Sequence, residues 1–579
     1  MKLRRLLTGA VFVAAVSCLA ARAAQEAAAA PGYVPFDPDY SAKARSVRIV
    51  SEMEAQSLKV PSALVRLPNR KLAIMVRGPS GKMQPFYPVG LATGYWSREE
   101  PTAAYFDQVF TNFEKLGANT AMIGLHWKVI EPEPGKFAFR YTDMVVDVAR
   151  KHGIKVWWVL FMHAQPPNWP VANVADFWLY HLDSHDGADY TIQWLKDDKG
   201  NLYRNIPDIL KVRGEILPSY SHPKVFPLVL RMLGALGRHY QDSDTVIALQ
   251  LGNEEGFVNS DWRGRPATEN WQADFNPVAQ GLYEDWKRKT GKSDWYTFKL
   301  DTVNSWWSRF TSAFHEADPF KLVSFNLMTG GEEAGYEWWI HQTGTDSATY
   351  RDGNIDVIGV MFHRPFNEQI WANLDRHYNY VYDRPILIPS EIGIDRTVEY
   401  FQQSAIETIG RGAQGYAVWA YTPNMVSREG TLSTEGTAFR RLAAMVQANL
   451  DIVHPGLPGP GDVSIEASEG FQVSQLHSAA GTIGILYFPR IYDIQLGPQD
   501  WDQVKALGIW QAAHPAQMFA GKFDVSVKVT AAKAGKYSIQ VYRDGEPLAP
   551  TTESLQENGT RTLTIPGLTK SDVVFLKVR

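Results

Sequence analysis

The sequence of 579 residues contains a single cysteine, Cys18, inside an N-terminal segment that we expect to be removed. A mature chain without cysteine has no disulfide, no thiolate nucleophile and no thiolate metal site. Histidine offers no metal signal either, because His126, His163, His222 and His363 are scattered and no paired spacing such as H-E-x-x-H occurs. We therefore expect no metal and no cofactor.

The sequence also lacks a large excess of either sign of charge. The chain has 58 Lys and Arg against 62 Asp and Glu, a formal net charge of −4, and no long charged run. This balance makes nucleic acid and anionic membrane poor candidates for partners. Aromatic residues, by contrast, reach 12% and include 19 Trp. Part of this set belongs to the core, but tryptophan also serves as a platform for the apolar faces of sugar rings.

The N-terminus has the features of a targeting segment. Basic residues within Lys2–Arg5 precede an apolar run at 6–21 that ends in small residues, as at a signal peptidase site. We interpret residues 1–24 as a signal peptide, with no membrane span in the mature chain, and expect export to the periplasm or the exterior. Lipid anchoring at Cys18 is the alternative, although Ala15–Cys18 matches a lipoprotein box poorly.

Eight apolar, strand-like runs follow one another, mostly separated by amphipathic helical segments. The runs are 86–92, 119–125, 155–161, 246–251, 322–327, 356–362, 385–389 and 415–420. The helical segments are 103–116, 141–152, 226–240, 277–290, 301–317 and 398–410. Repeated alternation of this kind predicts a (β/α)8 TIM barrel. An open doubly wound sheet is the alternative, but the first strand is not followed by a Gly-rich phosphate loop.

The composition divides the chain into further parts. Residues 25–60 are expected to be an N-terminal tether, and 61–450 the barrel. A Pro- and Gly-rich linker at 451–465 follows. Short alternating runs in 466–579 predict an antiparallel β-sandwich accessory domain, which could bind carbohydrate or brace the barrel.

Two of the barrel runs end in carboxylates, Glu254 after the fourth and Glu391 after the seventh. Catalytic groups of such barrels come from the carboxyl ends of the strands, which meet at one mouth. Two carboxylates roughly 5–5.5 Å apart are what a retaining glycosidase requires. Asn253 could donate to the sugar 2-hydroxyl, and Glu255 is the rival of Glu254, because side chains alternate along a strand.

These motifs resemble a known group of enzymes. Asn253–Glu254 and Glu391 resemble clan A glycoside hydrolases, which are retaining enzymes built on the (β/α)8 barrel. Within that clan, Leu125–Phe137 resembles the second-strand segment of β-galactosidases of families 35 and 42, with its E-P-x-x-G-x-F run. Gln250–Gly256 is similar to the fourth-strand motif of family 35, although Glu255 stands where that family usually carries an aromatic residue.

The resemblance implies roles for particular residues. Glu254 would be the acid/base and Glu391 the nucleophile, while Trp419 would lie beneath the sugar ring or, alternatively, belong to the barrel core. His363 would contact the nucleophile or a hydroxyl, or else be an ordinary loop histidine. Three further substrate-binding candidates are placed only by their strand ends: His126, Trp127 and His163.

The expected function is that of an exported retaining exo-β-glycosidase, in the first place a β-galactosidase of the family 35 type. It would release terminal galactose from oligosaccharides through a covalent glycosyl-enzyme intermediate. The alternatives are another clan A specificity, such as β-glucosidase, β-mannosidase or endo-glycanase, and a non-catalytic carbohydrate-binding protein. The partner is a glycoside in each case, and the sequence does not indicate an oligomeric state.

Overall fold

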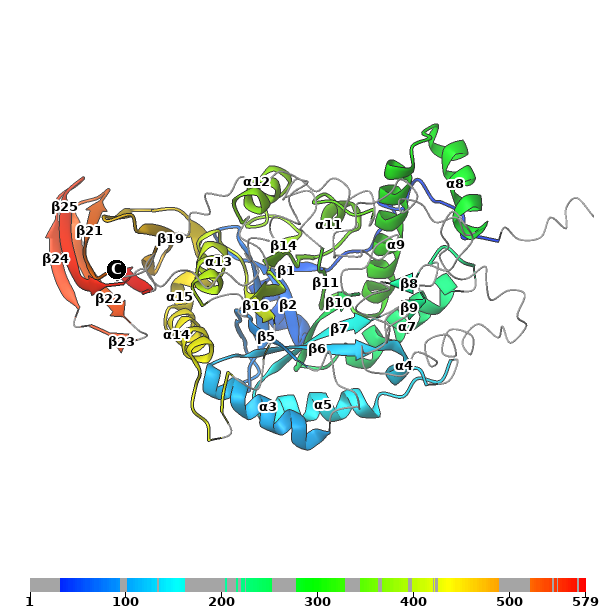
Figure 1. Ribbon diagram of the computed structural model, residues 1–579, viewed down its shortest axis with the longest axis horizontal. Coiled ribbons are helices and arrows are strands. Elements are labelled where there is room, and N and C mark those ends of the chain that lie inside the picture. The colour runs from blue at the N-terminus through cyan, green and yellow to red at the C-terminus, as the bar shows by residue number, and fades with distance from the viewer. Residues whose placement is uncertain are drawn as a thin grey trace, which may run out of the picture.

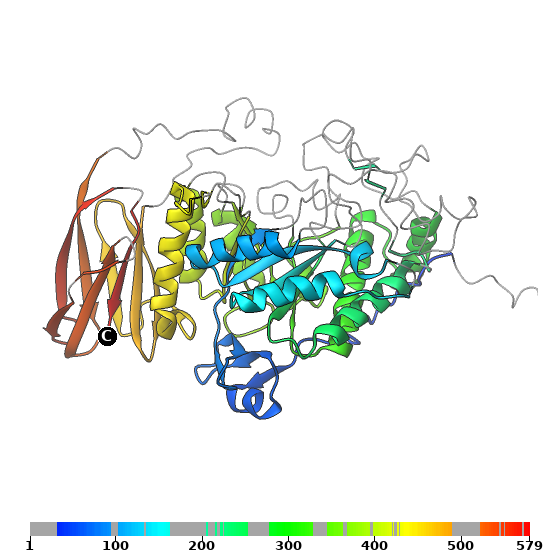
Figure 2. The same cartoon turned by 90° about the horizontal axis from the view of Figure 1, so that it is seen from below.

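The computed structural model describes residues 32–93, 102–132, 135–161, 204–205, 215–216, 220–223, 225–252, 277–327, 344–362, 367–393, 398–419, 421, 425–427, 429–488, 521–543, 546–548, 550–569 and 572–579. A parallel sheet ringed by helices forms the centre (Figure 1). Figure 2 shows a small four-stranded sheet, in blue, on one side of this centre and antiparallel sheets, in orange and red, at one end.

The central sheet closes into a ring of eight parallel strands. In ring order they are β5 (Val89–Thr93), β6 (Thr120–His126), β7 (Lys155–Phe161), β10 (Val246–Leu251), β11 (Leu322–Phe325), β12 (Val357–Ile358) continued by β13 (Met361–Phe362), β14 (Ile386–Leu387) continued by β15 (Glu391–Gly393), and β16 (Tyr416–Trp419). Each strand pairs in parallel with the next, and β16 pairs with β5. The predicted (β/α)8 barrel is therefore confirmed.

The seventh strand differs in detail from the expectation. The sequence suggested that Glu391 closes a run at 385–389, whereas the strand is interrupted at Pro389 and Glu391 opens its second piece, β15. Proline has no N–H to give to the ladder, so a break there is natural. The Pro389 carbonyl still accepts from Ala417 N at 2.8 Å, which keeps the broken strand in the ring.

Helices cover the outside of the ring. The longer ones are α3 (Ala103–Leu116), α5 (Arg140–Lys151), α7 (Val225–Tyr240), α8 (Pro277–Thr290), α9 (Trp295–Ala317), α12 (Asn367–His377), α13 (Val398–Gly410) and α14 (Thr434–Ala448), and the short ones are α4 (Trp127–Ile130), α11 (Thr349–Asp352) and α15 (Leu450–Val453). The sequence did not predict α12 and α14. The predicted start of α9, at 301, is six residues too late. The helix begins after its N-cap Asp294, whose side chain accepts from Thr297 N at 2.7 Å.

Side chains of the strands alternate between two hydrophobic clusters. On β6, Ala121, Ile123 and Leu125 belong to the large cluster between sheet and helices. Met122 belongs to a second cluster inside the ring, with Trp157 of β7. This alternation identifies the inner face of each strand.

The four-stranded sheet closes the amino-terminal end of the ring. Its strands are β1 (Ile49–Ser51), β2 (Ser62–Arg66), β3 (Leu72–Arg77) and β4 (Met83–Pro85), with α2 (Glu52–Leu58) beside them. Strands β2 and β3 pair in antiparallel orientation. Leu64, Leu72 and Ile74 join the inner cluster, so this sheet seals the barrel floor against water.

Residues 32–48 of the expected N-terminal tether lie along the outer helices, whereas residues 49–58 form β1 and α2. Phe36 N donates to Asp285 Oδ2 on α8 at 3.0 Å, and Lys289 Nζ donates to Phe36 O at 2.6 Å. Further on, Arg45 N donates to Ser312 Oγ on α9 at 2.9 Å. This segment is thus hydrogen-bonded to the barrel at both of its ends.

The C-terminal part consists of two antiparallel sheets. One contains β17 (Leu457–Pro458), β19 (Gln472–Ser478), β20 (Gly481–Tyr487), β26 (Val574–Val578), β22 (Gly535–Arg543), β23 (Glu546–Pro547) and β24 (Thr551–Leu555), and the other β18 (Val463–Ala467), β21 (Phe523–Ala531) and β25 (Thr560–Leu568). Residues of both sheets, such as Val527 and Leu576, share one hydrophobic cluster. A separate two-stranded pair, β8 (Arg204–Asn205) and β9 (Glu215–Ile216), lies between β7 and α7 in the sequence.

Contacts join these sheets to the barrel. Lys577 Nζ donates to Asp451 Oδ1 on α15 at 3.0 Å. The fully buried Lys71, at the start of the β3 strand, donates to Gly456 O at 2.6 Å. The expected linker at 451–465 therefore contains ordered structure, namely part of α15, β17 and the start of β18.

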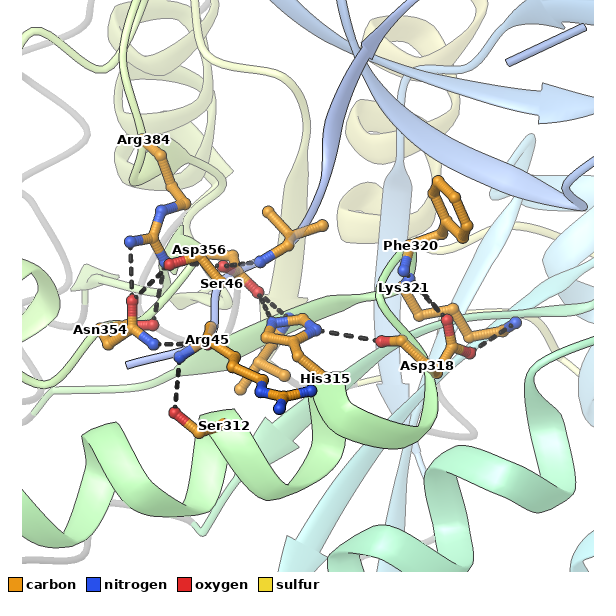
Figure 3. Close-up of polar contacts among 12 residues, drawn as sticks. Arg45, Ser46, Ser312, His315, Asp318, Phe320, Lys321, Asn354, Asp356 and Arg384 are labelled. Carbon is orange, nitrogen blue, oxygen red and sulfur yellow. Dashed lines mark hydrogen bonds and ion pairs between the residues drawn. The ribbon is translucent and has the colours of Figure 1, made fainter. Parts of the chain in front are cut away.

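A buried ionic network braces the amino-terminal end of the barrel strands (Figure 3). Asp356, just before β12, accepts from His315 Nε2 at 2.7 Å, Val323 N at 2.8 Å and Arg384 Nη1 at 2.9 Å. The other ring nitrogen of His315 contacts Asp318 O at 3.1 Å. Burial works against the ionised carboxylate, but His315 and Arg384 outweigh it and hold the pKa of Asp356 below its usual value.

This network generates a stability prediction. Replacement Asp356→Asn should lower the free energy of unfolding at pH 7 by about 3–5 kcal/mol, because it leaves the partner charges without a buried counter-charge. Since the pKa of Asp356 is depressed in the folded state, its contribution is complete above its usual value of 3.8 and is lost as the pH falls below it. Denaturant unfolding from pH 7 to pH 2 should therefore show a steeper acid loss in the wild type than in Asp356→Asn.

The matched control is Asp147→Asn, a carboxylate whose side chain is 63% exposed and paired with Arg150. It should change stability by less than about 1 kcal/mol. Equal acid sensitivity of the wild type and Asp356→Asn would show that Asp356 does not carry this effect.

Candidate active site

The carboxyl ends of the parallel strands meet at one edge of the barrel, where several chemically active side chains face inward. Their sequence neighbours belong to the outer cluster, namely Leu125, Phe325, Leu327, Phe362, Ile392 and Val418. By alternation, the residues between or beside them lie on the inner face. These inner residues are His126, Asn326, Met361, Glu391 and Trp419.

Glu391 lies in the middle of this edge. It is 3% exposed and forms a registered pair with Met361 on the neighbouring strand β13. Its Oε1 accepts from Asn326 Nδ2 at 3.0 Å. The geometry therefore presents a buried, hydrogen-bonded carboxylate at the position from which the sequence predicted a nucleophile.

Asn326 was not among the residues singled out from the sequence. It follows β11, within the run 322–327 that was interpreted only as a strand. A signal for it exists, because a single amide at the end of an apolar strand of a β/α barrel is placed as catalytic residues are placed.

Two other candidates also reach the barrel mouth. His126 ends β6, is 9% exposed and lies on the inner face. Trp419 ends β16, is partly exposed, and packs against the inner cluster. The packing of Trp419 suits a core residue and a platform for a sugar ring equally well. The sugar contacts predicted for His126 and Trp419 therefore stay predictions.

Trp127 is placed differently. Its side chain is 1% exposed, and its indole N–H donates to Glu131 Oε2 at 2.7 Å. Glu131, itself fully buried, also accepts from Gly135 N at 2.7 Å and from Arg231 on α7. These contacts tie α4, the E-P-x-x-G turn and α7 together, so they give Trp127 a structural role. Its predicted contact with substrate stays untested.

Four predicted site residues lie outside the described residues: Asn253, Glu254, His163 and His363. The described chain reaches Gly252, whose φ of +64° suits glycine and turns the backbone at the end of β10. The buried Gln250 donates from Nε2 to Gly252 O at 3.1 Å and so holds this turn. The strand that leads to Asn253 and Glu254 is thus anchored up to the residue before them.

Within the described residues, no group of three or more His, Cys, Asp or Glu side chains is arranged to hold a metal ion. In the same part of the chain, no helix has the length and apolar character needed to cross a membrane.

Comparison with known proteins finds a family model that matches part of the chain. The model of glycoside hydrolase family 42, described as β-galactosidase, matches residues 96–185, a segment that contains α3, β6, Trp127, Glu131 and β7. β-Galactosidase BbgII of Bifidobacterium bifidum is 23% identical over 232 residues, which are 39% of this chain and 27% of that protein. The chain thus spans about a quarter of the length of the curated relative it matches. The two matches confirm the resemblance to β-galactosidases of clan A, and the chain carries a glycoside hydrolase segment of this type.

Solved structures show more distant likenesses. The β-galactosidase of the psychrophilic Marinomonas ef1 is 12% identical with a TM-score of 0.43, over 62% of this chain and 60% of that chain. The β-galactosidase of the haloarchaeon Halorubrum lacusprofundi is 14% identical with a TM-score of 0.41, over 62% and 57%. Neither likeness bears on the substrate of this chain.

The Glu131 cluster can be tested by mutation. Glu131→Ala should lower the free energy of unfolding by about 3 kcal/mol, because each buried donor left unsatisfied costs about 1–3 kcal/mol. The buried donor concerned is the indole N–H of Trp127, and Arg231 also loses its carboxylate partner. Denaturant unfolding measures the loss.

Glu114→Ala is the matched control, since the Glu114 side chain is 50% exposed and pairs with His152. It should cost less than about 1 kcal/mol. If both variants were equally stable, the Glu131 cluster would not be the anchor described here.

Proposed function

We propose that this chain is an exported retaining exo-β-glycosidase, specifically a β-galactosidase that releases terminal galactose from oligosaccharides. The observation that carries the proposal is Glu391, a buried carboxylate on the inner face at the carboxyl end of the seventh barrel strand. The match of residues 96–185 to a β-galactosidase family model supports the choice of sugar.

The proposed mechanism uses two carboxylates. Glu391 attacks the anomeric carbon and forms a covalent glycosyl-enzyme, while Glu254 protonates the departing oxygen. Water then enters, Glu254 takes its proton, and the bond from the sugar to Glu391 breaks with retention of the anomeric configuration. An attacking carboxylate has to be correctly oriented, and Asn326 Nδ2 donates to Glu391 Oε1 at 3.0 Å.

Further residues complete the proposed site. Trp419 would support the apolar face of the sugar, and Asn253 would donate to its 2-hydroxyl, a contact that strengthens in the transition state. The remaining proposed substrate contacts are His126, Trp127, His163 and His363.

We extend the proposal to the ends of the chain. Residues 1–24 would be a signal peptide that directs export, with lipid anchoring at Cys18 as the alternative. N-terminal sequencing of the mature protein tests whether this segment is removed.

The two C-terminal sheets would form a β-sandwich that braces the barrel, which their shared cluster and the contact of Lys577 with Asp451 support. Asp451→Asn should then lower thermal stability and leave KM unchanged, and a change in KM without a loss of stability would contradict the bracing role.

The function is tested with a panel of nitrophenyl β-glycosides. The wild type should hydrolyse the galactoside, and Glu391→Gln and Glu254→Gln should each lower kcat/KM by at least about a thousandfold, which corresponds to ~4 kcal/mol of transition-state stabilisation. The anomeric configuration of the first product, followed by NMR, reports retention.

Glu255→Gln is the matched control, because Glu255 directly follows Glu254 in the sequence, and it should keep most of the activity. Hydrolysis of a glucoside or mannoside instead of the galactoside would overturn the sugar and keep the mechanism. Near wild-type rates in Glu391→Gln would overturn its role as nucleophile.

A further inference from the structure

A contact across three neighbouring strands reaches Glu391. Asn326 follows β11, Met361 lies on β13 and Glu391 opens β15, which are the fifth, sixth and seventh strands of the ring. Asn326 Nδ2 lies 3.7 Å from Met361 Sδ and donates to Glu391 Oε1 at 3.0 Å. The amide thus passes over the inner face of the sixth strand to hold a side chain of the seventh.

Asn326 is itself firmly placed. It is 0% exposed, and its neighbours Phe325 and Leu327 are buried in the outer cluster. The N–H of Leu327 donates to the hydroxyl of Tyr350 at 3.3 Å, and Tyr350 is fully buried. Because the backbone on the C-terminal side of Asn326 is anchored, its side chain has little freedom to leave Glu391.

The chemistry of the contact sets the orientation of the amide. Both atoms that Nδ2 approaches, a carboxylate oxygen and a thioether sulfur, are acceptors. With the amide turned over, its carbonyl oxygen would oppose the carboxylate, and two acceptors repel one another. The observed orientation is therefore the one in which the amide N–H groups face both acceptors.

A donor at this position orients the carboxylate. The hydrogen bond to Oε1 restricts the rotamers of the glutamate, and correct orientation of a reacting group contributes to its rate.

We propose that Asn326 is a positioning residue for the nucleophile Glu391, holding Oε1 so that the carboxylate stays aimed at the anomeric carbon. This inference rests on the function proposed above. Asn326 acts through Glu391 and is not assigned a contact with the sugar.

Two nearly isosteric variants test the inference. Asn326→Leu removes the donor and should lower kcat/KM about 10- to 100-fold, with most of the loss in kcat, and slow the labelling of Glu391 by a 2-deoxy-2-fluoro glycoside to the same extent. Asn326→Asp places a second carboxylate beside the first and should move the acidic limb of the kcat/KM profile upward by about one pH unit or more, because a like charge raises a carboxyl pKa. If Asn326→Leu failed to fold, the pH profile of Asn326→Asp would decide.

The control is Ser324→Ala, two residues earlier on the inner face of the same strand, where Ser324 Oγ accepts from Trp157 Nε1 at 3.1 Å. It should reduce stability without moving the acidic limb. A second control uses Glu391→Gly with azide as external nucleophile. If Asn326 acts through Glu391, adding Asn326→Leu to that background should change the azide-rescued rate less than twofold.

The outcomes separate the two proposals. A wild type that neither hydrolyses a glycoside nor is labelled at Glu391 overturns the proposed function and this inference with it. An active, labelled wild type whose Asn326 variants keep its rate and pH profile overturns the inference alone. A loss from Asn326→Leu that persists fully in the azide-rescued background also overturns it, since the effect would then be structural.

Discussion

Parallel pairing of eight strands into a closed ring is the constraint on which the rest of this structure depends. Because all strands run in one direction, residues at their carboxyl ends meet at a single edge although they are distant in the sequence. Asn326 and Glu391, which are 65 residues apart, become hydrogen-bonded neighbours in this way. The same ring divides each strand into an outer face that binds the helices and an inner face that is filled or left for chemistry.

The two ends of the barrel use buried carboxylates for different purposes. At the amino-terminal end, Asp356 is held by His315 and Arg384 beside a sheet that seals the floor, an arrangement suited to stability. At the carboxyl end, Glu391 receives a neutral amide from Asn326. The first arrangement pairs a buried charge with charged and polar partners, whereas the second orients the carboxylate that we propose as the nucleophile.

The sequence predicted elements well where hydrophobic periodicity was long and regular. The strands at 155–161 and 246–251 and the helices at 103–116, 277–290 and 398–410 have the predicted bounds. It missed α12 and α14, although Ser433, whose side chain accepts from Gly436 N at 3.1 Å, is a recognisable cap of α14. The break at Pro389 was also missed, because an apolar run containing proline was interpreted as one continuous strand.

The sequence by itself predicted the succession of strands and helices and the position of Glu391 near the end of the seventh strand, because these follow from periodicity within short segments. Closure into a barrel was inferred from the repeated alternation, with an open doubly wound sheet as the alternative. Segment 125–137 resembled β-galactosidases of families 35 and 42, and residues 96–185 match a family 42 model. Only the tertiary structure decided that Arg231 on α7 meets Glu131 and that Asn326 turns to Glu391. Both contacts depend on how separate elements pack against one another, and neither spacing nor composition within one element encodes which side chains will face each other.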